Sequence, residues 1–143
     1  MSKMIFVNLP VADLPKAKAF YEAIGFENNP MFTDETAACM VISDTIFVML
    51  LTHAKFAQFT TREIADSHKS AAHLIALSAD SRDGVDTITD AAIAAGGREH
   101  REKQDMGFMY GRSFEDLDGH VWEPMFMDMD AATQAMGPQT ADA

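Results

Sequence analysis

The chain has one cysteine among its 143 residues and no long hydrophobic run. A lone cysteine, Cys39, excludes an intrachain disulfide and is typical of a reducing compartment, so we expect a cytoplasmic protein. Because Cys39 lies in an apolar stretch beside Met40 and Val41, we expect a buried structural thiol. The longest apolar run, IFVMLL, is far too short to cross a bilayer, and the N-terminal residues show no signal-peptide pattern, so we expect no membrane segment.

Basic residues are also scarce. The chain has 11 Lys and Arg against 22 Asp and Glu, which gives a formal net charge of −11 and a pI of about 4.6. This balance argues against a nucleic-acid partner, because phosphate binding needs an excess of basic side chains. An acidic surface serves solubility, and it also favours cationic ligands or metal ions over anionic ones. No glycine-rich phosphate loop is present, since Gly96-Gly97 is better explained as the end of a helix.

The apolar content, 48%, is sufficient for the core of one domain of ordinary size. In the first half, MIFVNLPV alternates as a strand does, and ADLPKAKAFYEAIGF has the period of a helix with Asp13 as N-cap and Gly25 as its end. The runs at 36–43 and 45–52 predict two further strands joined by a short turn. The apolar stripe of the helix consists of Leu14, Ala17, Phe20, Tyr21 and Ile24.

The second half repeats this order after a polar segment that predicts a short helix and a loop. HLIALSAD predicts a strand, and RDGVDTITDAAIAAGG predicts a helix that ends at Gly96-Gly97. Two more strands follow, joined by a turn at Asp118-Gly119. We expect the inward face of this helix to carry Val85, Ile88, Ala92 and Ile93.

An internal repeat of this kind predicts one domain, 1–127, built from two modules at about 4–52 and 72–127. Each module has a sheet with one face covered by a helix, and two such modules side by side leave a concave surface. Eleven methionines suit an apolar pocket on that surface. The tail, 128–143, is small and polar, and we expect it to be loosely ordered.

The segments FVNLPVADLPKAKAFYEAIGF and FEDLDGHVWEPM resemble the vicinal oxygen chelate superfamily, which includes glyoxalase I, bleomycin-resistance proteins, extradiol dioxygenases and fosfomycin-resistance enzymes. The resemblance covers about 4–127. It implies an α+β fold in which two βαβββ modules form a cupped mixed sheet, usually within a homodimer. In the metal-using members, His, Glu and Gln side chains from the first and last strand of each module hold a divalent ion in the cup, where it acts as a Lewis acid.

Only one of the four metal-ligand positions implied by the resemblance carries a ligating side chain. Glu123 matches the last strand of the second module, but the two first-strand positions fall on Phe6 and Leu74. The last strand of the first module, IFVMLL, offers apolar side chains alone. His73 is one residue from a ligand position and is expected on the opposite strand face unless a bulge shifts the register, and His53 could lie at the rim of the cup.

Strand alternation places Glu123 on the cup face with Val121, Met125 and Met127, while Trp122 faces the helices. A carboxylate on that face is a remnant of the metal site, a ligand-binding group or a general base, and the sequence leaves these three roles open. Asn8 shares the cup face, either as a ligand contact or as a polar residue on a half-solvated strand. The expected ligand-binding residues are Phe6, Asn8, Met49, Leu51, Leu74, Ala76 and Met125.

The sequence therefore favours a small-molecule-binding protein with an apolar cup and no cofactor, similar to the bleomycin-resistance branch and dimeric. The alternative is a metal-dependent lyase or dioxygenase of the glyoxalase type. In that case Glu123 and His73, or Glu123 and His53, would form a non-standard ligand set for a divalent metal. Whether the protein is an enzyme stays open, with Glu123 as the candidate catalytic residue.

Overall fold

The structure, a computed structural model, describes residues 2–136. The first module has the order strand, helix, three strands, with one 3-10 turn. Its elements are β1 (Ile5–Val11), α1 (Leu14–Ala23), β2 (Glu27–Asn29), η1 (Pro30–Phe32), β3 (Ala37–Val41) and β4 (Ile46–Thr52). The strands form one sheet in the order β1-β4-β3-β2, and β1 runs parallel to β4.

A short helix, α2 (His53–Phe56), and a linker at 57–74 lead into the second module. The remaining elements are β5 (Ile75–Ser78), α3 (Arg82–Ala94), β6 (Arg98–Glu99), β7 (Gln104–Asp105), β8 (Met109–Gly111), β9 (Phe114–Glu115), β10 (Val121–Met127) and α4 (Met129–Met136). The second sheet has the order β6-β9-β10-β8-β7, with β5 parallel to β10 on its other side.

The four short strands β6 to β9 form two longer strands, each interrupted once. One consists of β6 and β7, and the other of β8 and β9. β8 and β9 both pair antiparallel with β10, and the break between them falls at Arg112, opposite Pro124. The Arg112 N–H still donates to the Pro124 carbonyl at 3.1 Å, but proline has no N–H to return. Counted in this way, each module is βαβββ, and the predicted α+β fold class is confirmed.

The predicted helix signals act as the sequence indicates. The Asp13 side chain accepts the N–H of Lys16 at 3.0 Å, and Gly25 after α1 has a φ of +108°, which favours glycine. All five residues of the predicted stripe of α1 are buried. Ser81 caps α3 in the same way, by accepting the N–H of Gly84.

The inward face of α3 was predicted wrongly at one position. Ile93 is 39% exposed, whereas Thr89 is fully buried between Val85 and Ala92. Positions 85, 89 and 92 lie on one helical face, and the Thr89 hydroxyl donates to the Val85 carbonyl at 2.8 Å. A buried threonine is tolerated because this bond inside the helix satisfies its hydroxyl.

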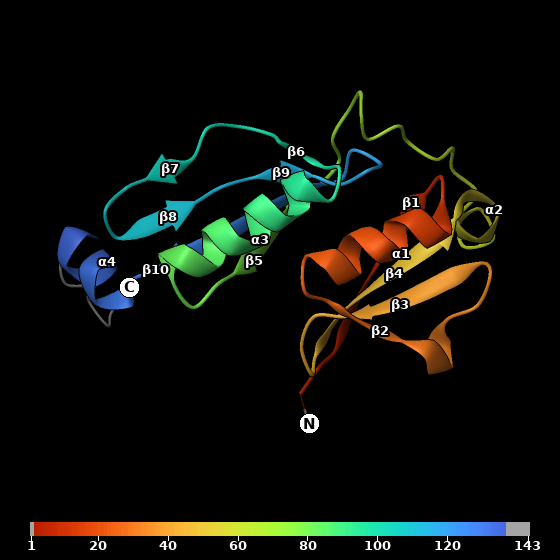
Figure 1. Cartoon of the computed structure of the whole chain (residues 1–143), viewed down its shortest axis with the longest axis horizontal. Helices are drawn as coiled ribbons and strands as arrows, with labels where there is room; N and C mark the ends of the chain where they lie inside the picture. Colours follow the sequence, from red (N-terminus) through yellow and green to blue (C-terminus); the bar gives the residue numbers. More distant parts are fainter. Residues whose placement is uncertain (1, 137–143) are drawn as a thin grey trace.

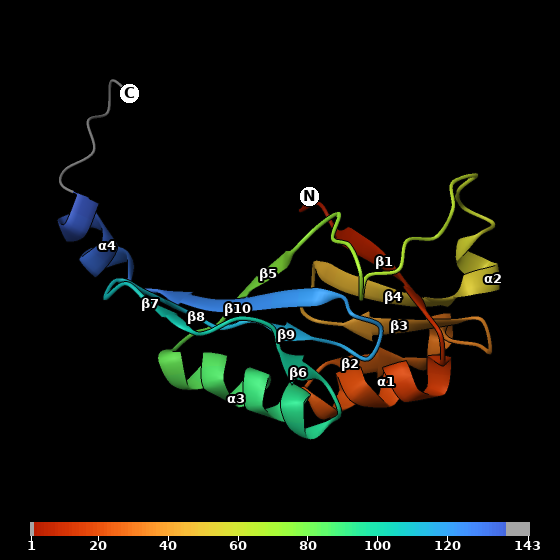
Figure 2. The same ribbon diagram turned by 90° about the horizontal axis from the view of Figure 1, so that it is seen from above.

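The two helices α1 and α3 lie on the same side of the two sheets, so both open sheet faces look the other way (Figures 1 and 2). The main core lies beneath the helices and draws on both modules. Trp122 of β10 is 1% exposed and packs against the rings of Tyr21, Phe26 and Phe114. The core therefore joins the modules through aromatic contacts.

Hydrogen bonds reinforce this junction. Trp122 Nε1 donates to the Tyr21 hydroxyl at 2.9 Å, and that hydroxyl donates to the buried carboxylate of Asp116. The second oxygen of Asp116 accepts the N–H groups of Asp118 and His120. Burial raises the pKa of Asp116, and burial together with this carboxylate raises the pKa of Tyr21.

Helix α4 follows β10 at one end of the molecule (Figure 1). The rest of the predicted loose tail, 137–143, lies outside the described residues. Within residues 2–136, no helix has the length and apolar character needed to cross a membrane.

Candidate functional site

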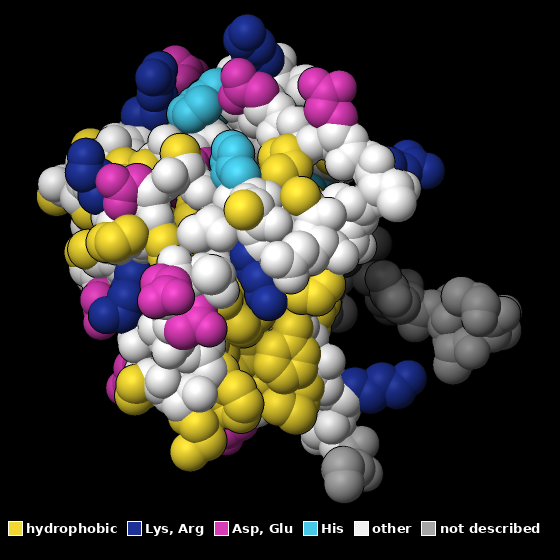
Figure 3. Space-filling model, turned by 90° about the vertical axis from the view of Figure 1, so that its right-hand side faces the viewer, with side chains coloured by type: hydrophobic (Ala, Val, Ile, Leu, Met, Phe, Trp, Pro, Cys, Tyr) yellow, Lys and Arg dark blue, Asp and Glu magenta, His cyan; other side chains and the backbone are white. Residues whose placement is uncertain are grey.

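The open face of the first sheet is apolar, as the strand alternation predicts. Phe6 of β1 is 50% exposed and stacks on Phe47 of β4, with ring centroids 4.8 Å apart. Met49 and Leu51 follow on the same face of β4, and Asn8 of β1 is the polar residue among them. Figure 3 shows hydrophobic side chains gathered in one exposed patch on the end of the molecule that carries this module.

The open face of the second sheet carries the charged groups. Glu123 of β10 is half-buried and lies beside Ala76 of β5 in the parallel register. With Met125, these residues line a shallow hollow of about 150 Å³ that also contains the polar side chains of Arg101, Glu102, Gln104 and Ser113. Cys39 on the first sheet is buried, as the sequence predicts, and burial raises the pKa of its thiol.

A second pocket lies between the two modules. The linker 57–74 folds back over the junction and borders a half-open space of about 290 Å³. Asn8 and Pro10 form the first-module side of the pocket, and His120 and Val121 form the second-module side. The remaining lining residues come from α2 and the linker: Phe56, Thr60, Arg62, Glu63, Ile64, Ala65, Ser67, Ser70, Ala71, Ala72 and His73, with Gly119 from the turn before β10.

His120 is a fixed part of this pocket and is only 4% exposed. Its Nε2 lies 2.8 Å from the Pro10 carbonyl, and because a carbonyl only accepts, Nε2 carries the hydrogen. Nδ1 of the same ring is buried and has no hydrogen-bond partner among the described residues. The ring of His73 stands nearly parallel to that of His120, with centroids 6.5 Å apart.

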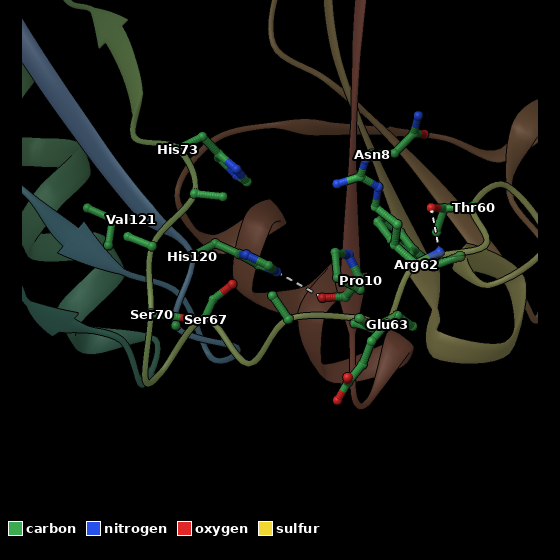
Figure 4. Close-up of a pocket in the computed structure, with 16 residues that line it drawn as sticks. Asn8, Pro10, Thr60, Arg62, Glu63, Ser67, Ser70, His73, His120 and Val121 are labelled. Atoms are coloured by element: carbon green, nitrogen blue, oxygen red, sulfur yellow. Dashed lines mark hydrogen bonds between the residues drawn. The ribbon is translucent and has the colours of Figure 1, made fainter.

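Arg62 is the charged side chain that reaches furthest into the pocket. In Figure 4 its guanidinium points from the linker toward His73 and Asn8, while the carboxylate of Glu63 points away from them. Within residues 2–136 the Arg62 guanidinium makes no hydrogen bond or ion pair, and its backbone N–H is bonded to the Thr60 hydroxyl at 3.1 Å. A positive group therefore faces the cavity without a protein counter-ion.

The linker is held in place by the turn that precedes β10. Gly119 has a φ of +85°, and a Cβ added there would lie 2.7 Å from the His68 nitrogen and 2.8 Å from the Ser67 carbonyl carbon. Only glycine allows the linker backbone to approach so closely. The turn predicted at Asp118-Gly119 thus has a second role, since it sets the position of one pocket wall.

The structure distributes the predicted site residues over different hollows. Asn8 and His73 line the pocket between the modules, whereas Glu123, Ala76 and Met125 line the shallow hollow of the second sheet. The other predicted residues lie on or beside the open sheet faces, with Phe6 and Leu74 exposed and Leu51 buried. Glu123 and His73, the candidate metal pair, thus line separate pockets.

His53 is exposed at the start of α2 and lines a third hollow with His68 and His120. In the described part of the chain, no three or more His, Cys, Asp or Glu side chains are grouped closely enough to hold a metal ion. Two pocket residues, Arg62 and His120, were not anticipated. Arg62 lies in a polar segment without periodicity, and His120 is brought to the pocket by a tertiary contact with Pro10.

Comparisons with known proteins agree with this architecture. The model of the family described as bleomycin resistance protein-like N-terminal matches residues 3–43. A hypothetical protein from S. aureus is 26% identical, with 88% of this chain and 94% of that chain covered and a TM-score of 0.74. A glyoxalase/bleomycin resistance protein/dioxygenase family enzyme from Burkholderia phytofirmans PsJN is 19% identical. The comparison covers 88% of this chain and 99% of that chain, with a TM-score of 0.73.

The fosfomycin resistance protein FosX from Listeria monocytogenes, whose structure is a complex with Mn(II) and a sulfate ion, is 19% identical. The comparison covers 96% of this chain and 99% of the FosX chain, with a TM-score of 0.68. Among curated proteins no match is found. The chain has the fold of the vicinal oxygen chelate superfamily, and the resemblance drawn from the sequence is confirmed. Its first module carries the bleomycin resistance protein-like family match.

Proposed function

We propose that this protein binds a small molecule in the pocket between its two modules, without the help of a metal ion. The observation that carries the proposal is the half-open pocket of about 290 Å³, which combines a largely apolar surface with polar groups from the linker and both modules. Binding sites in proteins commonly combine these two features. Asn8, expected from the sequence to contact a ligand, lies in this pocket, and Val121 and Phe56 supply apolar surface.

The proposal of metal-free binding rests on side-chain chemistry. By the resemblance, Phe6 and Leu74 stand at the two first-strand positions at which the metal-using members of the superfamily hold their ion, and neither has an atom that can ligate. Glu123 alone keeps a ligating group at such a position. In the pocket between the modules, Asn8 and Arg62 are suited to hydrogen bonding with a ligand instead.

A metal-dependent lyase or dioxygenase of the glyoxalase type is the second candidate. Two observations favour it, the retained carboxylate of Glu123 and the Mn(II) complex of the similarly folded FosX. In that case Glu123 would be the first ligand and His73 would have to move from its present pocket to join it. Metal content by elemental mass spectrometry, after incubation with Ni, Zn, Mn and Fe(II) and desalting, separates the two candidates, because a stoichiometric retained ion would overturn metal-free binding.

We also propose a homodimer. β1 pairs only with β4, and β5 only with β10, among the described strands, so each of these strands has an open edge. Large apolar side chains at or beside these edges are half-exposed: Met4, Ile5, Phe6 and Leu74. Burial of such surface is favourable and suits a second copy of the chain. Sedimentation equilibrium tests this, and a monomer at tens of micromolar would contradict it.

Localisation in the cytoplasm stays a prediction, which cell fractionation can test.

A matched pair of glycine variants tests the position of the ligand. Gly119→Ala adds a Cβ that collides with the linker backbone, whereas Gly107→Ala has the same strained backbone, with a φ of +82°, and nothing within 4 Å of the added atom. We expect Gly119→Ala to weaken binding of a neutral probe, benzamide, by at least about tenfold and Gly107→Ala to leave it unchanged. Equal binding by both variants, measured by NMR titration, would place the ligand elsewhere.

A further inference from the structure

The charge inside the pocket is opposite in sign to the charge of the whole protein. The chain carries a net charge of −11. Yet the guanidinium of Arg62 faces the cavity, and the only acidic side chain among the lining residues, Glu63, points away from Asn8 and His73 (Figure 4). Local charges decide the preference of a site, because exposed charges farther away than about 10 Å are largely screened at ordinary ionic strength.

Two groups in the pocket are placed to donate hydrogen bonds to one ligand, the Arg62 guanidinium and the His73 imidazole. Both come from the linker 57–74, and Asn8 of β1 lines the pocket beside them. In Figure 4 the Arg62 guanidinium and the His73 ring point toward each other across the pocket, whereas the amide of Asn8 points away from His73. A planar guanidinium fits a carboxylate with two parallel hydrogen bonds, so a carboxylate is the group this arrangement suits best.

Apolar side chains also line the pocket. Phe56, Ile64 and Val121 line the pocket together with alanines of the linker, and none of these can bond a polar group through its side chain. A ligand with a carboxylate at one end and a compact apolar body at the other would satisfy both parts of the surface.

We infer that the pocket between the modules is selective for small carboxylic acids with an apolar body, and that Arg62 is the residue that confers this selectivity. The inference rests on the proposed function, since it names the ligand class of the same site. It reverses the preference for cationic ligands that the net charge of the chain favours. His73 supplies a further hydrogen bond to the carboxylate, and His120 keeps the pocket wall in place through its bond to Pro10.

The experiment uses three probes of the same shape and different charge: benzoate, benzamide and benzylamine. Each is titrated into the ¹⁵N-labelled full chain and followed by NMR. We expect benzoate to bind at least about tenfold more tightly than benzamide, because a charge-assisted bidentate pair is stronger than neutral hydrogen bonds. Benzylamine should bind most weakly of the three.

Arg62→Gln is the test variant and Arg101→Gln the matched control. Both remove one positive charge from an exposed arginine, but Arg101 lines the hollow of the second sheet. Arg62→Gln should reduce benzoate affinity to that of benzamide without changing benzamide affinity, and Arg101→Gln should leave the preference for benzoate intact. An equal loss in the two variants would show a general effect of net charge and would overturn the inference.

The outcomes also separate the inference from the proposed function. If benzoate and benzamide bind equally well in the pocket, or if benzylamine binds best, the selectivity for carboxylic acids is wrong while the proposed function stands. If none of the three shifts the amide signals of the linker and of Gly119 to Val121, the proposed function fails, and the inference fails with it.

Discussion

The two modules share one order of elements but differ in how their sheets are built. In the first module β1 and β4 are seven residues long, and their open faces are apolar apart from Asn8. In the second, β6, β7, β8 and β9 have two or three residues each, and Arg112 is surrounded by Asp86, Asp90 and Glu99. The first module thus presents an apolar open face, whereas the second module pairs an arginine with carboxylates that include two from its helix α3.

This difference indicates where a repeat fold can acquire a site of its own. The helices and aromatic core hold both modules in the same frame, so the segments outside that frame are free to vary. Here the linker 57–74 contributes most of the pocket residues, although it belongs to neither module.

The largest effect is expected at the aromatic junction. Trp122→Ala removes a ring that packs on Tyr21 and Phe26 of the first module and on Phe114 of the second. Truncation of a fully buried aromatic residue costs about 3–5 kcal/mol, which can unfold a domain of this size. Phe59→Ala, at an exposed site, should change the free energy of unfolding by less than about 0.5 kcal/mol. Urea denaturation measures both, and similar losses would disprove the role of the junction.

A smaller loss is expected when only the hydrogen bonds across the junction are removed. Tyr21→Phe deprives Trp122 Nε1 of its acceptor and Asp116 of a donor, and both groups are buried. Leaving such groups unpaired costs about 1–3 kcal/mol.

Tyr110→Phe is the comparison within one module. It removes a single bond, 2.6 Å long, to Asp86, a carboxylate that water can reach. We expect a loss of about 0.5–1.5 kcal/mol in urea denaturation, below that of Tyr21→Phe. If Tyr110→Phe is the more damaging variant, the bond between the modules is not the more important of the two.

The charge cluster of the second module should contribute less. Arg112→Gln leaves Asp86, Asp90 and Glu99 without their common partner. Because these carboxylates are exposed and screened, we expect a loss of about 1 kcal/mol that shrinks in 1 M NaCl. Lys18→Gln breaks a single pair 3.9 Å long with Glu22 in the first module and should have no measurable effect. A loss for Arg112→Gln that does not change with salt would point to packing rather than charge.

The smallest effects are expected in the pH dependence of stability, where two carboxyl groups act with opposite sign. Burial raises the pKa of Asp116 above 3.8, so the folded state binds more protons than the unfolded state there. Stability from this group falls as the pH rises from 3.8 through the raised pKa. The hydrogen bond from Tyr110 lowers the pKa of Asp86 below 3.8. Burial, the second effect in size, opposes it, and the contact with Arg112 adds a smaller lowering.

The contribution of Asp86 to the stability of the folded state is therefore present above pH 3.8 and is lost as the pH falls through the lowered pKa. Urea denaturation from pH 3 to pH 7 should show Asp116→Asn with less loss of stability on the alkaline side than the wild type. Asp86→Asn should show less loss on the acidic side. If Asp116→Asn instead changes the loss on the acidic side, and Asp86→Asn the loss on the alkaline side, the account of these carboxyl groups is contradicted.

Much of the frame was predictable because local signals and tertiary packing agree in it. Asp13 caps α1 and Gly25 ends it, and the alternation in β1 places Leu9 inward and Phe6 outward. The buried Thr89 could not be predicted, since the choice between it and Ile93 depends on which side of α3 meets β10. The interruption of β8 and β9 opposite Pro124 likewise depends on register.

The candidate site was predictable only in part. Asn8 was identified from strand alternation, and His73 from its place beside a ligand position. Arg62 reaches the pocket only because the linker folds back, and the contact of Gly119 with Ser67 and His68 that holds the linker joins residues about fifty positions apart. Polar segments without periodicity carry no signal of such a fold.

The most direct test of the central claim is a map of the amide signals that shift when benzoate is added to the ¹⁵N-labelled protein. The account predicts that the shifted signals cluster in the linker at 62–73, at Asn8 and at Gly119 to Val121, around the pocket between the modules. Shifts clustered instead at Gln104, Glu123 and Met125 would place the ligand in the hollow of the second sheet and would contradict the account.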